Sequence, residues 1–359
     1  MRLLVGSVLC AIGCWATLAA GGAPTAEEYE KPETKVGVDA DGAVHLPPMI
    51  VPFSSFASPQ AKAAYLDFQR LLKAVDRMSV AEQRQWVDDT AHARDREADI
   101  TPTTIAGVYT DVIAPKDGVA RRNRHRVLIN LHAGGFLVGR TGAADSIPVA
   151  NLLKIKVVTI DYRQGPEYKF PAGSEDVAAV YKELLKSYRP KSIGIYGSSA
   201  GGVLTAQAIA WFTKENLPSP GAIGILCASA DGWAGGDSGS LATALMGETP
   251  PRQPADLGPH PSVDNATYFK DADIDDPLVS PIRSPALLAR FPPTLIIAST
   301  RDPALSPAVY THTQLVKLGV DAELHVWEGM THGFLMYPDL PETKEVWDVV
   351  ARFFDKHLN

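Results

Sequence analysis

The sequence predicts an α/β protein in which a mostly parallel sheet carries helices on both faces. Beyond residue 103, short apolar runs alternate with longer segments whose apolar residues recur at helical spacing. Strands separated by amphipathic helices are typical of such sheets. One segment, 230–284, breaks the rhythm with many Gly, Pro and Asp residues. An insertion of this kind is expected to lie over the strand ends, where ligands bind.

The same patterns place the individual elements. Two helices are expected first, one from residue 60 to about residue 75 and a shorter one after Ser79. The expected strands are residues 108–113, 127–131, 157–162, 193–196, 223–227, 294–298 and 323–327. The expected later helices are residues 174–185, 200–212, 307–318 and 343–354, with one more near 240–246. For the helix at residue 307, Ser306 is the predicted N-cap, and Gly319 follows the last turn.

Composition limits the classes of protein that the chain can belong to. The 359 residues are 45% hydrophobic and 21% charged, which is typical of a globular chain with a large core. The net charge of -7 gives no basic surface for nucleic acid, so no nucleic-acid partner is expected. The oligomeric state stays open.

The N-terminus is predicted to be a signal peptide, residues 1–22. Arg2 precedes an apolar run over residues 3–20, and small residues suited to cleavage follow. We therefore expect a secreted or periplasmic protein without stable membrane insertion after cleavage. An uncleaved anchor and a lipoprotein attached at Cys14 are the alternatives. Cleavage would remove Cys10 and Cys14 and leave only Cys227, which is expected to be a buried core residue.

The remaining chain is divided into two parts by the sequence pattern. Residues 23–102 are expected to form an N-terminal arm followed by cap helices. Residues 103–359 are expected to form the catalytic domain, with the cap insertion at about 230–284.

A serine nucleophile is predicted at Ser199. The segment Gly197 to Gly201 reads G-x-S-x-G, follows the strand at residues 193–196 and opens a helix. This strand–turn–helix setting lifts a serine hydroxyl above a sheet, and the glycines allow so sharp a turn. Ser198 stands at the variable position of the motif, so Ser199 is the expected nucleophile.

A base and an acid must accompany this serine, because a hydroxyl is a poor nucleophile until its proton is removed. His332 lies in a loop between the last strand and the last helix, downstream of the serine and of an acid, as the chain order requires. Asp302 directly follows the strand at residues 294–298 and is the expected acid. Asp231 is the alternative acid. The other histidines, such as His325 within a strand, fit structural roles.

Backbone donors for an oxyanion are predicted in the loop after the strand at residues 127–131. This loop reads His132-Ala133-Gly134-Gly135-Phe136, and its two glycines let backbone amides approach a ligand. The amide of Ala200, the residue after the nucleophile, is the third expected donor.

These motifs together resemble the hormone-sensitive lipase family of α/β hydrolases, over about residues 108–354. The loop at residues 132–136 is similar to the family's His-Gly-Gly-Gly motif, residues 197–202 to its Gly-Asp-Ser-Ala-Gly-Gly motif, and residues 161–172 to its Asp-Tyr-Arg-Leu-Ala-Pro-Glu block. Ala133 replaces a glycine, Ser198 replaces the aspartate beside the nucleophile, and Gln164-Gly165 replaces Leu-Ala. Local support of the turn at Ser199 can therefore differ from the family's.

The resemblance implies an α/β-hydrolase fold with a helical cap and hydrolysis of carboxylic esters without a metal or organic cofactor. The expected function is that of a serine carboxylesterase, acting on small to medium esters through an acyl-enzyme intermediate. An amidase or lactonase with the same triad stays open, as does a binding protein that has lost catalysis. Pocket size depends on how a few large side chains fold over the site: Tyr65, Phe68, Trp233, Met246 and Phe269.

Overall fold

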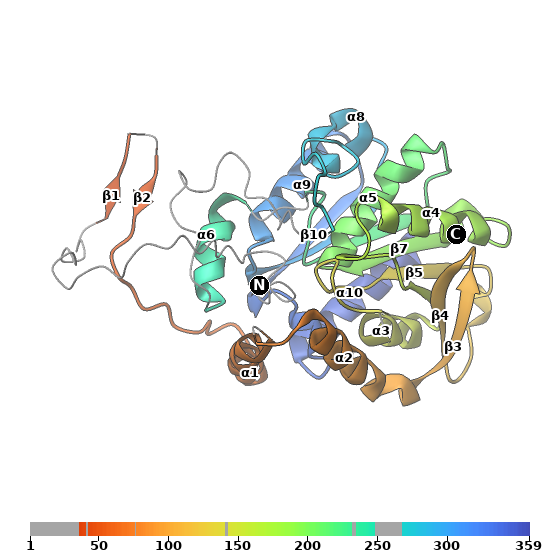
Figure 1. Ribbon diagram of the computed structural model, residues 1–359, viewed down its shortest axis with the longest axis horizontal. Coiled ribbons are helices and arrows are strands. Elements are labelled where there is room, and N and C mark those ends of the chain that lie inside the picture. Colours follow the sequence, from red (N-terminus) through yellow and green to blue (C-terminus); the bar gives the residue numbers. More distant parts are fainter. Residues whose placement is uncertain (1–35, 41, 76, 141–142, 232–234, 248–267) are drawn as a thin grey trace.

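The computed structural model describes residues 36–40, 42–75, 77–140, 143–231, 235–247 and 268–359 (Figure 1). The predicted signal peptide, Cys10, Cys14 and Trp233 lie outside these residues. The centre of the molecule is an eight-stranded sheet in the order β10-β9-β8-β7-β5-β6-β4-β3. Its strands are β3 (Ala98–Ile105), β4 (Val108–Pro115), β5 (Val127–Leu131), β6 (Lys156–Ile160), β7 (Ile193–Ser198), β8 (Ala222–Leu226), β9 (Thr294–Arg301) and β10 (Ala322–Thr331).

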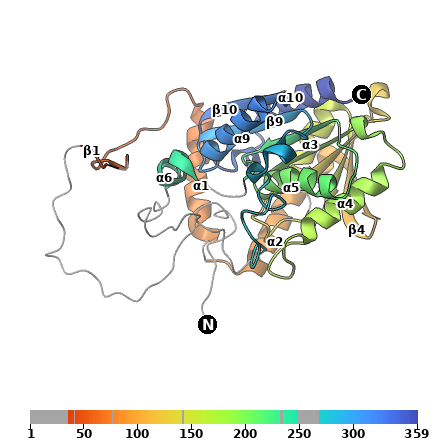
Figure 2. The same ribbon diagram turned by 90° about the horizontal axis from the view of Figure 1, so that it is seen from above.

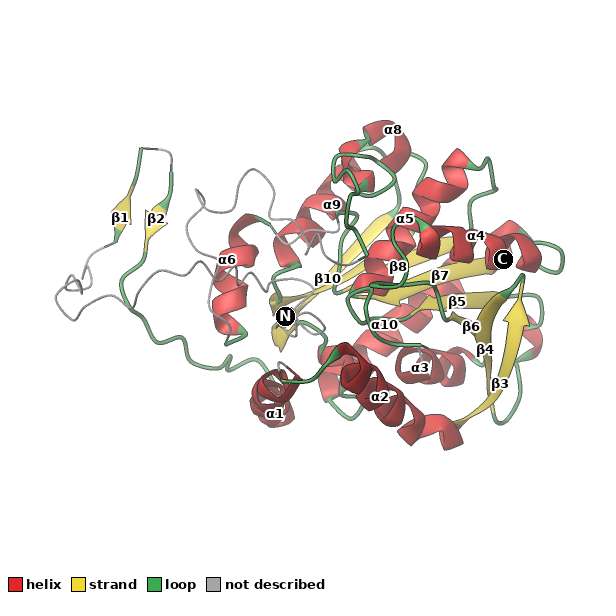
Figure 3. Cartoon of the chain, in the orientation of Figure 1, coloured by secondary structure: helices red, strands yellow, loops and turns green. Residues whose placement is uncertain are grey.

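The sheet is mostly parallel, as the sequence predicts. The strands from β10 to β6 pair in parallel, and the β6–β4 and β4–β3 pairs at one edge are antiparallel. Helices cover both faces (Figure 3). They are α1 (Pro59–Val75), α2 (Val80–Ala91), α3 (Ala143–Leu153), α4 (Ala172–Leu184), α5 (Ala200–Lys214), α6 (Gly236–Leu245), α8 (Pro285–Leu288), α9 (Leu305–Lys317) and α10 (Pro341–His357). Short 3₁₀ helices are η1 (His92–Glu97), η2 (Arg121–Asn123), η3 (Pro190–Ser192), η4 (Pro281–Arg283) and η5 (Phe334–Met336).

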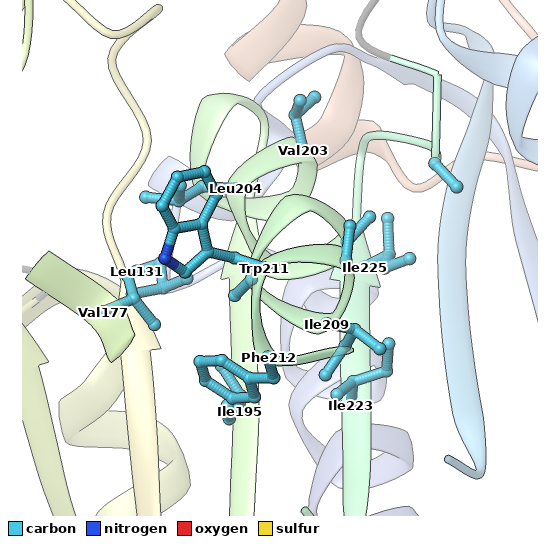
Figure 4. Packing of buried hydrophobic residues seen from close by; sticks show 14 of the residues in the cluster. Leu131, Val177, Ile195, Val203, Leu204, Ile209, Trp211, Phe212, Ile223 and Ile225 are labelled. Atoms are coloured by element: carbon cyan, nitrogen blue, oxygen red, sulfur yellow. The ribbon is translucent and has the colours of Figure 1, made fainter. Parts of the chain in front are cut away.

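The core consists of two layers, one on each face of the sheet. Ile195 on β7 and Ile225 on β8 belong to the layer that includes α4, α5 and α9, and Figure 4 shows them among side chains of this layer such as Ile209 and Phe212. Tyr196, the next residue of β7, belongs to the opposite layer with α3 and α10. This alternation follows from the two-residue period of a strand. A Cβ at Gly194 would lie 2.6 Å from the ring of Phe354, so this glycine lets α10 approach the sheet.

Two of the elements that the sequence did not predict, β3 and α3, were missed for identifiable physical reasons. Strand β3 is an exposed edge strand that contains Pro102 and has few apolar residues, so it lacks the usual alternation. The predicted domain boundary between residues 102 and 103 falls inside it. Helix α3 is buried on most sides, so no single apolar stripe marks it, and Pro148 lies within it.

The predicted N-cap of α9 is wrong. Ala304 is the N-cap, and Ser306 is the second residue of the helix. The hydroxyl of Ser306 instead accepts a 3.0 Å hydrogen bond from the amide of Ser238 in α6. Ser306 therefore ties the insertion to α9. Gly319 follows α9 with a φ of +78°, as predicted.

The N-terminal part of the described chain begins with a small hairpin, β1 (Gly37–Val38) and β2 (Val44–His45), which stands away from the sheet (Figures 1 and 2). Helix α1 packs against the insertion. Phe68 and Leu72 of α1 share an apolar cluster with Met246, and the Tyr65 hydroxyl donates a 3.0 Å hydrogen bond to the carbonyl of Leu245. No helix within the described ranges is long and apolar enough to cross a lipid bilayer.

Candidate active site

Ser199 stands in a strained turn between β7 and α5. Its φ of 53° and ψ of -121° lie in a region that side chains other than glycine rarely adopt. The chain can turn so sharply because the residues two before and two after Ser199, Gly197 and Gly201, are glycines. A Cβ at Gly201 would lie 1.9 Å from the carbonyl oxygen of Leu131, and one at Gly197 would lie 2.4 Å from Gly201. The amide of Ser199 donates to the Leu226 carbonyl at 2.8 Å, which fixes the turn against β8.

Strand register brings Asp302 beside His332. Strands β9 and β10 are parallel neighbours, and Arg301 pairs with Thr331. The next residue on each strand is the acid and the histidine, so both side chains leave the same edge of the sheet. Nδ1 of His332 lies 3.0 Å from each carboxylate oxygen of Asp302, and its Nε2 lies 2.9 Å from Oγ of Ser199. The structure thus brings the three predicted residues into one hydrogen-bonded series.

The predicted acid, Asp302, is shielded from water. Asp302 has no exposed surface and His332 is 4% exposed. The amide of Ala304 donates to Oδ1 of Asp302 at 2.8 Å, which orients the carboxylate from its other side. A buried carboxylate aimed at Nδ1 holds the hydrogen on that nitrogen, and Nε2 is left to face the serine.

The alternative residues lie elsewhere. Asp231 forms an ion pair with Arg283, with 3.8 Å between Oδ2 and Nη2. His325 is 3.5 Å from a carboxylate oxygen of Glu323 on β10. His312 lies in α9, where its Nε2 is 3.2 Å from the Ala322 carbonyl. These positions match the structural roles expected of the two histidines.

The amides of Gly134 and Gly135 are free of protein acceptors within the part of the chain that the structure describes. Their direction follows from the carbonyls of the same peptide groups, because N–H and C=O of one peptide point opposite ways. The Gly134 carbonyl accepts from the amides of Leu137 and Val138, both at 3.0 Å. The N–H of Gly135 must then point away from that turn.

His132 fixes the neighbouring peptide. Its Nδ1 lies 2.7 Å from the Ala133 carbonyl, and the ring stacks on Tyr162 with 4.1 Å between centroids. Burial lowers the pKa of His132 to about 4, so the imidazole is neutral near pH 7. Since a carbonyl only accepts, Nδ1 carries the hydrogen and donates it. The Gly134 N–H of that peptide therefore has a fixed direction as well.

Ala200 is the first residue of α5. The first N–H groups of a helix have no acceptor within the helix, so this amide can serve a ligand beside Ser199. The amides of Gly202 and Val203 donate to the Ser199 carbonyl at 2.9 and 3.1 Å. The helix N-terminus is thus anchored to the backbone of Ser199, the predicted nucleophile.

One supporting residue has no signal in the sequence. Oγ of Ser198 donates a 2.7 Å hydrogen bond to Oδ2 of Asp145, near the start of α3. Both side chains are buried, and burial raises the pKa of Asp145 to about 6 against the effect of this hydrogen bond. A carboxylate of α3 therefore contacts the side chain at position 198, where the resembled family has an aspartate.

Comparison with known proteins decides the family. A sequence model described as the alpha/beta hydrolase fold matches residues 128–336. The chain belongs to the α/β hydrolase fold family. Its predicted fold and its resemblance to the hormone-sensitive lipase family are both confirmed.

Solved structures agree with this assignment. A crystal structure of esterase E25 is 26% identical with a TM-score of 0.70, covering 88% of this chain and 98% of that one. An esterase from the bacterial hormone-sensitive lipase family is 25% identical with a TM-score of 0.72, covering 85% and 100%. An esterase/lipase from an uncultured bacterium shares the fold at 24% identity and a TM-score of 0.71, covering 84% and 99%.

Three of the five residues expected to set the pocket size are buried in this structure. Phe68, Met246 and Phe269 are each at most 3% exposed, so they are packing residues in this structure. Phe269 contacts the ring of Phe136, which follows the two loop glycines, with 5.0 Å between centroids. Among the described residues, no group of three or more His, Cys, Asp and Glu side chains is arranged to hold a metal ion.

Proposed function

We propose that this α/β hydrolase is a serine carboxylesterase acting on carboxylic esters of small to medium size. The observation that carries the proposal is the hydrogen-bonded series from Ser199 through His332 to Asp302, with distances of 2.9 and 3.0 Å. Two similar solved structures support the proposal, because both are esterases and are 25–26% identical to this chain.

The first half of the reaction forms the acyl-enzyme. Oγ of Ser199 attacks the ester carbonyl carbon while Nε2 of His332 takes the hydroxyl proton. The carbonyl oxygen becomes an oxyanion that the amides of Gly134, Gly135 and Ala200 stabilise. The carbon–oxygen bond to the alcohol then breaks, and Nε2 of His332 gives its proton to the leaving alcohol.

The second half repeats these steps with water. His332 takes a proton from water, whose oxygen attacks the acyl carbon. The bond to Oγ breaks, the proton returns to Ser199, and the carboxylic acid leaves. Throughout, Asp302 keeps the hydrogen on Nδ1 and stabilises the imidazolium that forms in each half.

The test is hydrolysis of p-nitrophenyl esters from acetate to palmitate by the parent and by Ser199→Ala. We expect turnover to fall by about 10⁴-fold or more, because the whole covalent route is lost. Circular dichroism should be unchanged. Ser198→Ala is the matched control, since it removes the adjacent hydroxyl and should keep measurable turnover.

A covalent label gives an independent readout. A fluorophosphonate should add one equivalent of mass to the peptide that contains Ser199 in the parent and in Ser198→Ala, but not in Ser199→Ala. Equal ester turnover by Ser199→Ala and the parent would overturn the proposal. A labelled parent that cleaves anilides or lactones faster than esters would move the substrate class to amides or lactones.

A further inference from the structure

The loop that carries the predicted oxyanion donors is held from outside by a single arginine. Arg84 lies on α2, and its Nε donates a 2.9 Å hydrogen bond to the carbonyl of Leu137, two residues after Gly135. One terminal nitrogen of the same guanidinium donates to the Gly165 carbonyl at 2.7 Å. Gly165 in turn donates its amide to the Phe136 carbonyl at 2.7 Å. The guanidinium therefore binds the loop both directly and through its neighbour.

The arginine is itself fixed in place. Both terminal nitrogens donate to the carboxylate of Glu167, each at 2.8 Å, so the pair is bidentate. Such a fork is planar and directional, and lysine cannot reproduce it. The guanidinium plane, set by Glu167, aims Nε at the Leu137 carbonyl.

Apolar packing couples the same two segments. Leu137 and Val138 are at most 4% exposed and form a cluster with Val75 at the end of α1. Partly buried residues of α1, α2 and the turn between them complete the cluster: Leu71, Met78, Val80 and Val87. The loop thus inserts the side chains of Leu137 and Val138 among the N-terminal helices. The hydrogen bond from Arg84 holds the loop's backbone at Leu137 against α2.

We propose that Arg84 is a positioning residue for the loop at residues 132–138. In this proposal, the position of α2 sets the direction of the Gly134 and Gly135 amides. The inference rests on the proposed function. The Gly135 amide points away from the turn in which Leu137 and Val138 donate to the Gly134 carbonyl. The Leu137 carbonyl belongs to the same peptide group as the Val138 N–H, which donates to the Gly134 carbonyl. Losing the hydrogen bond from Arg84 frees this peptide group to rotate. Misplaced amides of Gly134 and Gly135 then stabilise the oxyanion poorly.

The test compares Arg84→Gln, Arg84→Lys and Glu167→Gln with the parent. Arg84→Gln is expected to lower kcat by about 10- to 100-fold with KM changed less than about 2-fold, since the amides act in the transition state. Arg84→Lys keeps the charge but not the fork and should fall between. Glu167→Gln keeps the donor to Leu137 but weakens the fork that orients it, so its kcat should fall less than that of Arg84→Gln.

Arg126→Gln is the matched control. Arg126 also pairs with a carboxylate, 3.1 Å from Asp355, but lies at the start of β5, at the opposite end of that strand from the loop. It should keep the parent's turnover. Affinity for a trifluoromethyl ketone, whose hemiketal oxyanion uses the same amides, should fall in Arg84→Gln by the same factor as kcat/KM.

Hydrogen exchange separates this inference from the proposed function. In Arg84→Gln, peptides containing the Leu137 and Val138 amides should exchange faster, while those from β7 and β8 stay unchanged. This readout decides the inference even if the parent cleaves no ester, an outcome that would defeat the proposed function alone. Unchanged exchange in this loop would overturn the role of Arg84, and so would equal turnover by Arg84→Gln and a parent that cleaves esters.

Discussion

The hydroxyl of Ser198 and the carboxylate of Asp145 form a buried 2.7 Å hydrogen bond immediately before Ser199. Ser198 is the last residue of β7, and Asp145 is the third residue of α3. The carboxylate lies near a helix N-terminus, where the helix dipole favours negative charge. The turn at Ser199 is therefore supported by a partner on another helix.

This pair predicts an unusual pH dependence of stability. Burial raises the pKa of Asp145 to about 6 from an ordinary value of 3.8. The folded protein thus binds the carboxyl proton of Asp145 more tightly than the unfolded chain does. This tighter binding adds to the free energy of unfolding at low pH, and the added stability is lost as pH rises from about 4 to 6. Asp145→Asn removes this loss and can still accept from Ser198. We expect it to be more stable than the parent by about 2–3 kcal/mol at pH 7.5 and similar to the parent near pH 4.

Urea unfolding of both proteins between pH 4 and 7.5 measures this difference. A difference that does not change with pH would show that Asp145 does not titrate in this window. A loss of stability in Asp145→Asn that is largest at pH 7.5 would mean that the charge itself holds α3 to the turn.

Gly134 should tolerate no side chain. Its φ is +119°, and a Cβ there would lie 2.1 Å from the carbonyl oxygen of Val138. Gly134→Ala must displace the loop, and we expect a loss of about 10²-fold or more in kcat, comparable to removal of one oxyanion donor. Gly319→Ala is the control, because Gly319 has a φ of +78° with nothing within 4 Å of its Cβ. It should cost about 1 kcal/mol of stability without changing turnover. Equal kcat for Gly134→Ala and the parent would remove this loop from the mechanism.

Local motifs explain which features the sequence could predict. Ser199, Asp302 and His332 each sit in a short segment whose strand, turn and chain order are readable without knowledge of the fold. Asp145 and Arg84 carry no such signal. Asp145 meets Ser198 across 53 positions of the chain, and Arg84 meets Leu137 across another 53. Their partners become neighbours only when α2 and α3 are packed, and α3 itself has no one-sided apolar pattern.

Export and thiol content give a prediction at the N-terminus. We propose that the mature protein begins between about residues 21 and 27, so that Cys227 is its only cysteine. Cys227 is 1% exposed, and burial raises the pKa of its thiol well above the ordinary value. A thiol reagent should therefore find no reactive group in the folded secreted protein and one group after denaturation. Mass spectrometry of the secreted fraction locates the terminus. A chain that starts at Met1 there, with three thiols, would contradict cleavage.

The assignment of Asp302 as the triad acid can be tested by comparing it with Asp231, since each aspartate follows a strand of the sheet. Asp302 is buried against His332, while Asp231 is paired with Arg283 at 3.8 Å. Asp302→Asn keeps the shape but can donate toward Nδ1, so the imidazole is free to adopt the wrong tautomer. In a related triad this change costs about 10⁴-fold in turnover. We expect a similar fall in kcat with little change in KM.

Asp231→Asn should act through stability or substrate binding and leave kcat within about 3-fold, because its carboxylate pairs with Arg283 and not with His332. Steady-state kinetics of both variants on one short-chain ester, with thermal unfolding as the control for folding, gives the ranking. If Asp231→Asn were the variant that loses several powers of ten in kcat, the orientation of His332 would have to depend on a rearrangement that brings Asp231 to Nδ1.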